Sequence, residues 1–168
     1  MFHPSIPKAA RVQHVGKEEL MNCTDVMTPA PVCCEPGDEI TDAARLMKTG
    51  NVGALPVVKD RRGWLLAGMI TDRDIAVRVV AEGRDPAQTT VGEVMSPEPV
   101  TCASDDLYQE ALQAMAVHQL RRMPVVDPTG RLVGIIAQAD IATRVSQPST
   151  TGALVEAISE PAISASPR

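Results

Sequence analysis

The chain contains an internal repeat, and this feature limits its fold more than any other. Moving the 168-residue sequence so that residue 26 meets residue 94 places "VMTPAPVCC" (26–34) on "VMSPEPVTC" (94–102). The same offset brings "PVV" at 56–58 onto "PVV" at 124–126. A polar turn shorter by two residues then brings "GMITDRDIA" (68–76) onto "GIIAQADIA" (134–142). The repeat predicts one supersecondary unit present twice, with each copy covering apolar surface of the other.

Each copy predicts the same order of elements: strand, helix, strand, strand, helix. A short strand ("PVCC" or "PVTC") precedes apolar residues at helical spacing, which are Ile40, Ala43, Ala44 and Met47 in one copy and Leu107, Ala111 and Met115 in the other. Two strands then form a hairpin, and a second helix begins near Asp72 or Gln138. We therefore predict an α/β (α+β) fold with two small three-stranded sheets and helices, packed by pseudo-twofold symmetry.

The repeats also divide the chain. We predict an N-terminal arm over 1–23, the first motif over 24–86 and the second over 90–147, joined at "PAQTT" (86–90). Residues 148–168 form a Ser-, Pro- and Ala-rich C-terminal arm with one short helix predicted at Leu154 to Ile158.

Composition excludes several classes of function. The net charge of −5 and the aromatic content of 2% do not favour a nucleic-acid-binding surface, which needs clustered cations and often stacking rings. The longest apolar run, "WLLAGMI", is far shorter than the roughly 18 residues of a membrane span. The opening residues lack a continuous apolar signal segment. These patterns predict a cytoplasmic protein that binds neither nucleic acid nor membrane.

The pattern of cysteines and histidines favours neither a metal site nor an enzyme. Four cysteines and three histidines show no C-x-x-C or H-x-x-x-H spacing. Cys33, Cys34 and Cys102 fall in apolar runs, where a free thiol acts as a small hydrophobic group, although a redox-sensing role is an alternative. Because the chain also lacks a Gly-rich phosphate loop and a Ser/His/Asp arrangement, we predict no catalytic activity.

Two interpretations exist for Thr71-x-x-Asp74 in "TDRD". A Thr followed three residues later by an acidic residue is typical of a capping box at a helix start. The second copy keeps Asp140 but has Ala137 in place of the threonine, which favours a role for the acid beyond capping. In such a role the carboxylate accepts hydrogen bonds from a ribose diol while the hydroxyl bonds a sugar or phosphate oxygen.

Three arginines suggest that an anion binds nearby. Arg73 lies in the first turn of a predicted helix, where a cation is unfavourable unless an anion is close. Arg121 and Arg122 precede the second "MPVV" strand, where the first copy has Gly53 and Ala54. A solvated pair is the simpler interpretation, but the symmetry of the repeat would also bring these side chains to a phosphate in a shared cleft.

The two copies resemble consecutive CBS motifs, which together form a CBS pair or Bateman module, over about residues 24–147. The resemblance rests on the duplicated "VM[TS]P", on the "PVV" strands and on "GMITDRDI" with "GIIAQADI". It implies a stand-alone bacterial CBS-domain protein with an adenosine ligand in clefts between the motifs. The ligands implied are AMP, ADP or ATP, with NAD(H) or S-adenosylmethionine as further candidates.

The resemblance also assigns roles to individual residues. It implies that Thr71 and Asp74 hold ribose and phosphate and that Arg122 contacts phosphate. The backbone from Thr90 to Met95, including Val94, is implied to frame adenine. Asp140 is implied to mark a second cleft, which lacks the threonine hydroxyl.

We therefore predict a regulatory module that senses energy or redox state and signals to a partner. The alternative is a ligand-independent scaffold in which "TDRD" is only a helix cap. A homodimer is predicted in both cases, because the helices near Ile75 to Val80 and Ile141 to Val145 are too apolar to remain exposed.

Overall fold

The computed structural model describes residues 21–138 of the chain. Its helices are α1 Cys23–Val26, α2 Ile40–Gly50, α3 Asp72–Ile75, the π-helical turn η1 Ala76–Val80, α4 Val91–Val94 and α5 Tyr108–Val117. Its strands are β1 Thr28–Pro29, β2 Ala54–Val58, β3 Leu66–Thr71, β4 Ser96–Pro97, β5 Cys102–Ala103, β6 Arg122–Val126 and β7 Leu132–Ala137. No helix in this part of the chain is long and apolar enough to cross a membrane.

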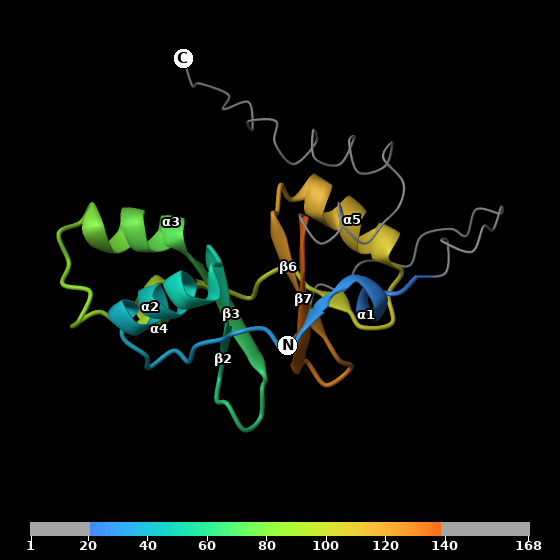
Figure 1. Cartoon of the computed structure of the whole chain (residues 1–168), viewed down its shortest axis with the longest axis horizontal. Helices are drawn as coiled ribbons and strands as arrows, with labels where there is room; N and C mark the ends of the chain where they lie inside the picture. The colour runs from blue at the N-terminus through green and yellow to red at the C-terminus, as the bar shows by residue number, and fades with distance from the viewer. Residues whose placement is uncertain (1–20, 139–168) are drawn as a thin grey trace, which may run out of the picture.

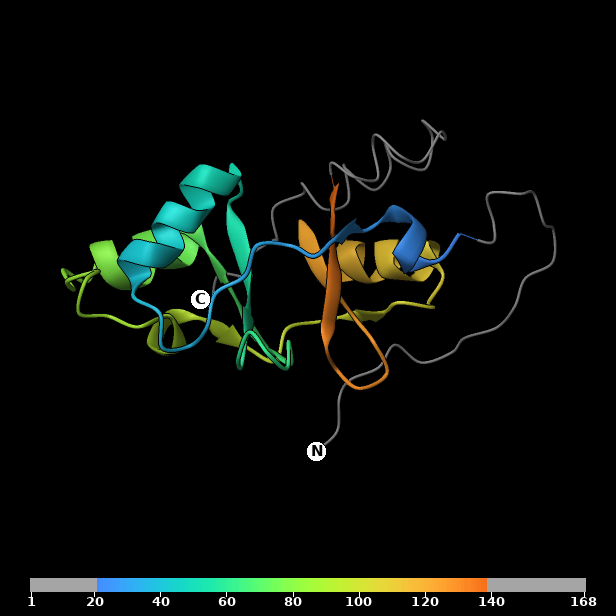
Figure 2. The ribbon, with the colours of Figure 1, turned by 60° about the horizontal axis from the view of Figure 1, so that its bottom comes forward.

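Two units lie side by side, each with a small sheet toward the middle of the molecule and helices on its outer side (Figures 1 and 2). The first unit has the strand order β2-β3-β4 and the second has β1-β7-β6-β5. The mixed fold with two small sheets is confirmed. The predicted count of three strands holds for the first sheet only, because β5 pairs with β6 in the second while Cys34 makes a single bridge to Val57 in the first.

The repeats exchange their leading segments, which we define as residues 23–29 and 91–97. Strand β1 pairs with β7 of the second repeat, with Pro29 opposite Gly134. Strand β4 likewise pairs with β3 of the first repeat, with Pro97 opposite Gly68. Each leading segment therefore completes the sheet of the other repeat, so that neither unit is continuous in sequence.

This exchange explains the glycines of "GMI" and "GII". A Cβ at Gly68 would lie 2.8 Å from both Met95 Sδ and the Ser96 carbonyl oxygen. A Cβ at Gly134 would overlap the Met27 side chain, with Met27 Cγ at 2.8 Å. Close strand pairing therefore accounts for both glycines.

Each unit has its own apolar core, built partly from the other repeat's leading segment. Cys23 and Val26 of α1 pack with Ala111 and Met115 of α5 in the second unit. Val91 and Val94 of α4 similarly join Ile40, Ala43 and Met47 of α2 in the first unit. The predicted apolar faces are largely confirmed, but Ala44 is exposed and Leu107 precedes α5 with 38% of its surface exposed.

The hairpin turns join the two units. The carboxylate of Asp60 accepts the Gly63 N–H at 2.6 Å, and that of Asp127 accepts the Arg131 N–H at 3.0 Å, as in turns stabilised by an Asp side chain. Arg131 Nε in turn donates to the Gly63 carbonyl oxygen at 2.7 Å. This last bond, together with the Leu132 N–H that donates to the Trp64 carbonyl oxygen at 2.8 Å, ties the tips of the β2–β3 and β6–β7 hairpins together.

The second helix of the first repeat begins at Asp72, as predicted, and continues as η1. Gln138 is helical and is the last residue described. The predicted helices at Ile141 to Val145 and Leu154 to Ile158 therefore lie outside the described residues, as does most of the N-terminal arm.

Candidate ligand-binding cleft

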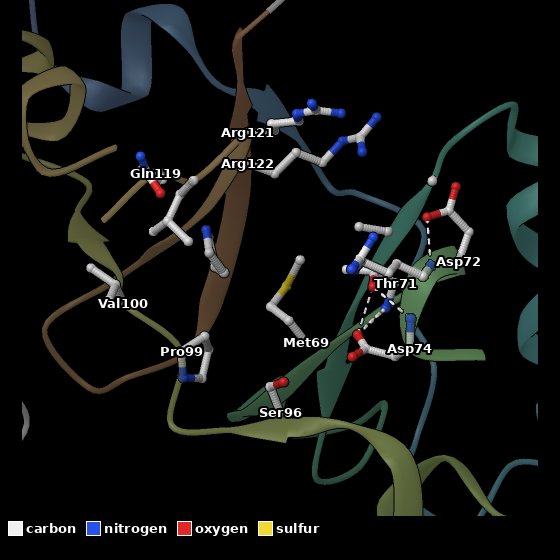
Figure 3. Close-up of a pocket in the computed structure, with 15 residues that line it drawn as sticks. Met69, Thr71, Asp72, Asp74, Ser96, Pro99, Val100, Gln119, Arg121 and Arg122 are labelled. Atoms are coloured by element: carbon white, nitrogen blue, oxygen red, sulfur yellow. Dashed lines mark hydrogen bonds between the residues drawn. The ribbon is translucent and has the colours of Figure 1, made fainter. Parts of the chain in front are cut away.

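A cleft of about 580 Å³ lies between the two units. It is lined by the turn from β3 into α3, by the start of β6 and the loop before it, and by residues in and after β4 (Figure 3). The cleft thus forms at the place where the leading segment of one repeat meets the hairpin of the other.

The start of α3 forms a capping box, as the sequence predicts. Asp74 Oδ2 accepts the Thr71 N–H at 3.0 Å and the Thr71 hydroxyl at 2.6 Å, while the Thr71 Oγ1 accepts the Asp74 N–H at 3.1 Å. Both residues also line the cleft. Because a carboxylate has about four acceptor positions, the capping bonds on Oδ2 leave acceptor capacity on Oδ1.

Arg78, which the sequence analysis did not single out, forms an ion pair with Asp74 and does not line the cleft. Its Nε lies 3.7 Å from Asp74 Oδ1, and its Nη1 donates to the Val94 carbonyl oxygen at 2.7 Å. Arg78 therefore links the carboxylate to the exchanged segment. Its position one helical turn after Asp74, at i+4, was the available sequence signal.

Three arginines supply the positive charge of the cleft. Arg73, Arg121 and Arg122 all line it, although Arg73 comes from the first repeat and the other two from the second. Figure 3 shows Arg121 and Arg122 at the start of β6, with their side chains extending toward the side of the cleft on which Asp72 lies. Within residues 21–138 none of the three forms an ion pair, so their charge is available to an anion.

Asp72 is a second carboxylate in the cleft that sequence reasoning missed. Its N–H donates to the Gly53 carbonyl oxygen at 3.0 Å, and its Oδ1 accepts the Arg73 N–H at 2.7 Å. A Cβ at Gly53 would lie 2.8 Å from Asp72 Oδ2 and 3.6 Å from Arg122 Nη1. The missing side chain at Gly53 therefore lets the carboxylate and the guanidinium share this wall of the cleft.

The rest of the lining is mainly apolar, and sequence reasoning missed it as well. Its residues are Met69, Pro99, Val100, Leu120 and Pro124, with the polar side chains of Ser96 and Gln119 between them. Such a surface accepts a flat apolar group while the charged residues hold its polar end. Several of them lie in the repeated motifs: Ser96, Pro99 and Val100 in "VMSPEPVTC", Pro124 in "PVV" and Met69 in "GMITDRDIA". The repeat itself was therefore the available sequence signal.

The remaining predicted site residues lie elsewhere. Thr90 donates its N–H to Glu93 Oε2 at 2.8 Å at the start of α4, Val94 is buried in the core, and Met95 packs against Gly68. None of these three lines the cleft, which the segment reaches instead through Ser96. Asp140 lies outside the described residues.

A second, smaller cleft of about 250 Å³ is related to the first by the repeat. Most of its lining residues are the counterparts of residues in the first cleft: Thr28 for Ser96, Pro31 for Pro99, Val32 for Val100, Val52 for Leu120, Pro56 for Pro124, and Ile135 for Met69. Ala54 and Arg122 are counterparts of each other, and both residues line both clefts.

The cysteines do not contribute to these sites. Burial raises the pKa of Cys34 to about 12, and a hydrogen bond with Cys23 together with burial raises the pKa of Cys102. These thiols stay protonated, as expected for small hydrophobic groups. No cluster of three or more His, Cys, Asp or Glu that could hold a metal ion occurs within residues 21–138.

Comparison with known proteins gives the family. The model of the CBS domain matches residues 23–81 and 91–147, the two repeats described above. This chain belongs to the CBS-domain family. It is 45% identical over 135 residues to the CBS domain-containing protein YhcV of Bacillus subtilis, covering 80% of this chain and 93% of that protein.

Solved CBS-pair structures share the fold. The structure of Hypoxic Response Protein I with two coordinated zinc ions has a TM-score of 0.67 and 37% identity, covering 74% of this chain and 99% of that one. CBSX2 in complex with AMP has a TM-score of 0.63 and 26% identity, covering 72% and 93%. The MJ0100 CBS domain pair with 5′-methylthioadenosine and S-adenosyl-L-methionine has a TM-score of 0.64 and 28% identity, covering 73% and 94%.

Proposed function

We propose that this CBS pair binds an adenine nucleotide in the larger cleft and that its occupancy regulates a partner protein. The observation that carries the proposal is the convergence on one cleft of two aspartates, an apolar wall and three arginines that form no ion pair within residues 21–138. The AMP complex of CBSX2 and the S-adenosylmethionine complex of MJ0100 support a ligand of this class. AMP, ADP, ATP and NAD(H) are the leading candidates.

The cleft divides the ligand's groups among its walls. Asp74 and Thr71 accept and donate hydrogen bonds at the ribose, Arg121, Arg122 and Arg73 meet phosphate, and the apolar wall receives adenine. Guanidinium groups suit this task because each can bond two phosphate oxygens at once. We propose a binding protein rather than an enzyme, because these residues hold a ligand and supply no activated nucleophile.

The test is a thermal-shift and calorimetric screen with AMP, ADP, ATP, NADH and S-adenosylmethionine. A ligand that binds only the folded state raises the free energy of unfolding by about 2.7 kcal/mol at a hundred times its Kd. Arg121→Ala should remove most of the shift. Arg45→Ala is the matched control, since Arg45 is exposed on α2, pairs with Asp42 and does not line the cleft.

The alternative function, a ligand-independent scaffold, is favoured by the capping box, in which Thr71 and Asp74 already satisfy each other. It predicts no shift with any ligand in the screen. Zn²⁺ is included as a separate arm, because the Hypoxic Response Protein I structure holds zinc ions. A shift with Zn²⁺ alone would contradict our prediction that no metal is needed.

We also propose a homodimer that covers the outer face of η1. Val77 and Val80 are 51% and 65% exposed there, which is unusual for apolar residues on neighbouring helical positions. Light scattering at tens of micromolar should give twice the chain mass for the wild type, and Val80→Asp should give the monomer. A monomeric wild type would contradict this proposal.

A further inference from the structure

Arg122 lies where the two clefts adjoin. It lines both of them, together with Ala54, which occupies the corresponding position in the first repeat. Strict symmetry would place either two cations or none at this junction. The replacement of one member of the pair by alanine leaves a single guanidinium between two clefts of the same design.

The two clefts differ in how much positive charge they have besides Arg122. The larger cleft also has Arg73 and Arg121. The described lining of the smaller cleft has no other cationic side chain, and its charged or polar side chains are those of Arg122 and Thr28. A phosphate in the smaller cleft would therefore depend on Arg122, whereas one in the larger cleft gains from it beside two other arginines.

No ion pair within residues 21–138 holds the Arg122 side chain in place. Its Nη1 lies 3.6 Å from the position that a Gly53 Cβ would occupy, and Asp72 Oδ2 lies 2.8 Å from the same position, so the guanidinium has a carboxylate near it without an ion pair. A bidentate bond from a guanidinium to phosphate uses one planar pair of its five N–H groups, and two phosphates that need the same pair compete for it. Two phosphates in opposite clefts would compete for the same donor group.

We propose that Arg122 is a phosphate-binding residue shared by the two clefts, so that one phosphate-bearing ligand lowers the affinity of the chain for a second. The proposal rests on the proposed function, because it requires that phosphate-bearing adenosine ligands enter the larger cleft. A neutral adenosine ligand makes no demand on the guanidinium and binds each cleft independently. Arg122 thus limits how many phosphate-bearing nucleotides one chain binds tightly, and it places no such limit on neutral ligands.

The experiment isolates each cleft by filling the other. Val100 lines the larger cleft and Val32 is its counterpart in the smaller one, so Val100→Trp and Val32→Trp are matched blocking variants. Calorimetric titration with AMP then measures each cleft alone. Arg122→Ala should weaken AMP binding roughly ten- to a hundredfold in both blocked variants, whereas Arg121→Ala should do so only in Val32→Trp.

Sharing also predicts coupling in the unblocked chain. The second AMP should bind the wild type at least about fivefold more weakly than AMP binds Val100→Trp. Repulsion between two phosphates would give coupling as well, but it would persist or grow in Arg122→Ala. If Arg122 is shared, the ratio between AMP affinity with the other cleft empty and with it filled should fall toward one in Arg122→Ala.

A comparison without blocking variants uses the wild type and two probes. Adenosine should fill two independent sites, and AMP should fill them sequentially with the second weaker. Two equal and independent AMP sites would overturn the proposal that Arg122 is shared. It would also be overturned if folded Val100→Trp binds no AMP while Val32→Trp does, because the smaller cleft would then hold no phosphate-bearing ligand. Absence of binding by every probe to every form would instead overturn the proposed function itself.

Discussion

Asp74→Ala tests whether the turn at the start of α3 is a binding site or only a helix cap. The substitution removes a carboxylate whose side chain is 17% exposed. Its Oδ2 accepts two hydrogen bonds from Thr71, at 3.0 Å and 2.6 Å, and its Oδ1 faces Arg78 at 3.7 Å. These contacts set the expected loss of stability before any ligand is considered.

The loss of stability has two parts. Breaking the capping box costs about 0.5–2 kcal/mol, and the pair with the half-exposed Arg78 adds at most about 1 kcal/mol. The free energy of unfolding should therefore fall by roughly 0.5–3 kcal/mol. Each kcal/mol lowers Tm by about 2–4 °C for a chain of this length. If Asp74 also binds the ligand, losing a charged hydrogen bond worth about 1.5–3 kcal/mol weakens affinity about ten- to a hundredfold.

Glu93→Ala is the matched control. Glu93 accepts the N–H and hydroxyl of Thr90 at 2.8 Å and 3.0 Å, the same two bonds that Asp74 makes with Thr71, but it does not line the cleft. Denaturant titration should show that both variants lose stability. Calorimetry with AMP or ATP should show that only Asp74→Ala loses affinity.

Two results would refute this reasoning. Unchanged affinity in a folded Asp74→Ala would mean that "TDRD" is a cap and nothing more. An equal loss of affinity in Asp140→Ala would mean that the clefts are equivalent despite Ala137. The affinity and stability of Thr71→Val should lie between those of the wild type and Asp74→Ala, because valine keeps the backbone N–H that donates to the Asp74 carboxylate.

Two further predictions concern stability. Gly134→Ala should lower the free energy of unfolding by about 1–3 kcal/mol, because the new Cβ would overlap Met27. In a double-mutant cycle, Met27→Ala should relieve part of this cost. If the effects of the two substitutions on the free energy of unfolding are strictly additive, the two side chains do not pack as described. Burial raises the pKa of Cys34 from 9.0 to about 12, so the unfolded chain releases this proton first and stability should fall as pH rises from 9.0 toward 12. Unfolding titrations across that range should show a shallower fall in Cys34→Ala, and an equal slope in both proteins would argue against a buried thiol.

The sequence by itself determined the features that arise from neighbours along the chain. The repeat, the helix–strand–strand order and the helix start at Asp72 follow from local patterns of apolar residues, turn residues and caps, and the structure agrees with them within residues 21–138. The predicted strand at "PVCC" is reduced to a single bridge from Cys34 to Val57. The capping box between Thr71 and Asp74 was likewise readable, because its partners are three residues apart. The resemblance to CBS motifs then supplied the location of a ligand cleft.

The tertiary structure decided which repeat each leading segment completes. Burial of apolar surface is non-directional, so Val91 and Val94 would satisfy the core of either unit as far as their pattern shows. The exchange turns Thr90, Val94 and Met95 away from the cleft and brings Ser96, Pro99 and Val100 to it. Contacts between strands distant in sequence depend on how two whole sheets face each other, and no local period encodes that arrangement.

The same reason explains Asp72, Gly53 and Arg122. Their types are visible in the sequence, but their meeting on one wall depends on the pairing of hairpins from separate repeats. That Arg122 borders two clefts rather than one likewise follows from the pseudo-twofold packing. The sequence alone determined which charges the chain carries, and the packing of the two units decided which of them a ligand can reach.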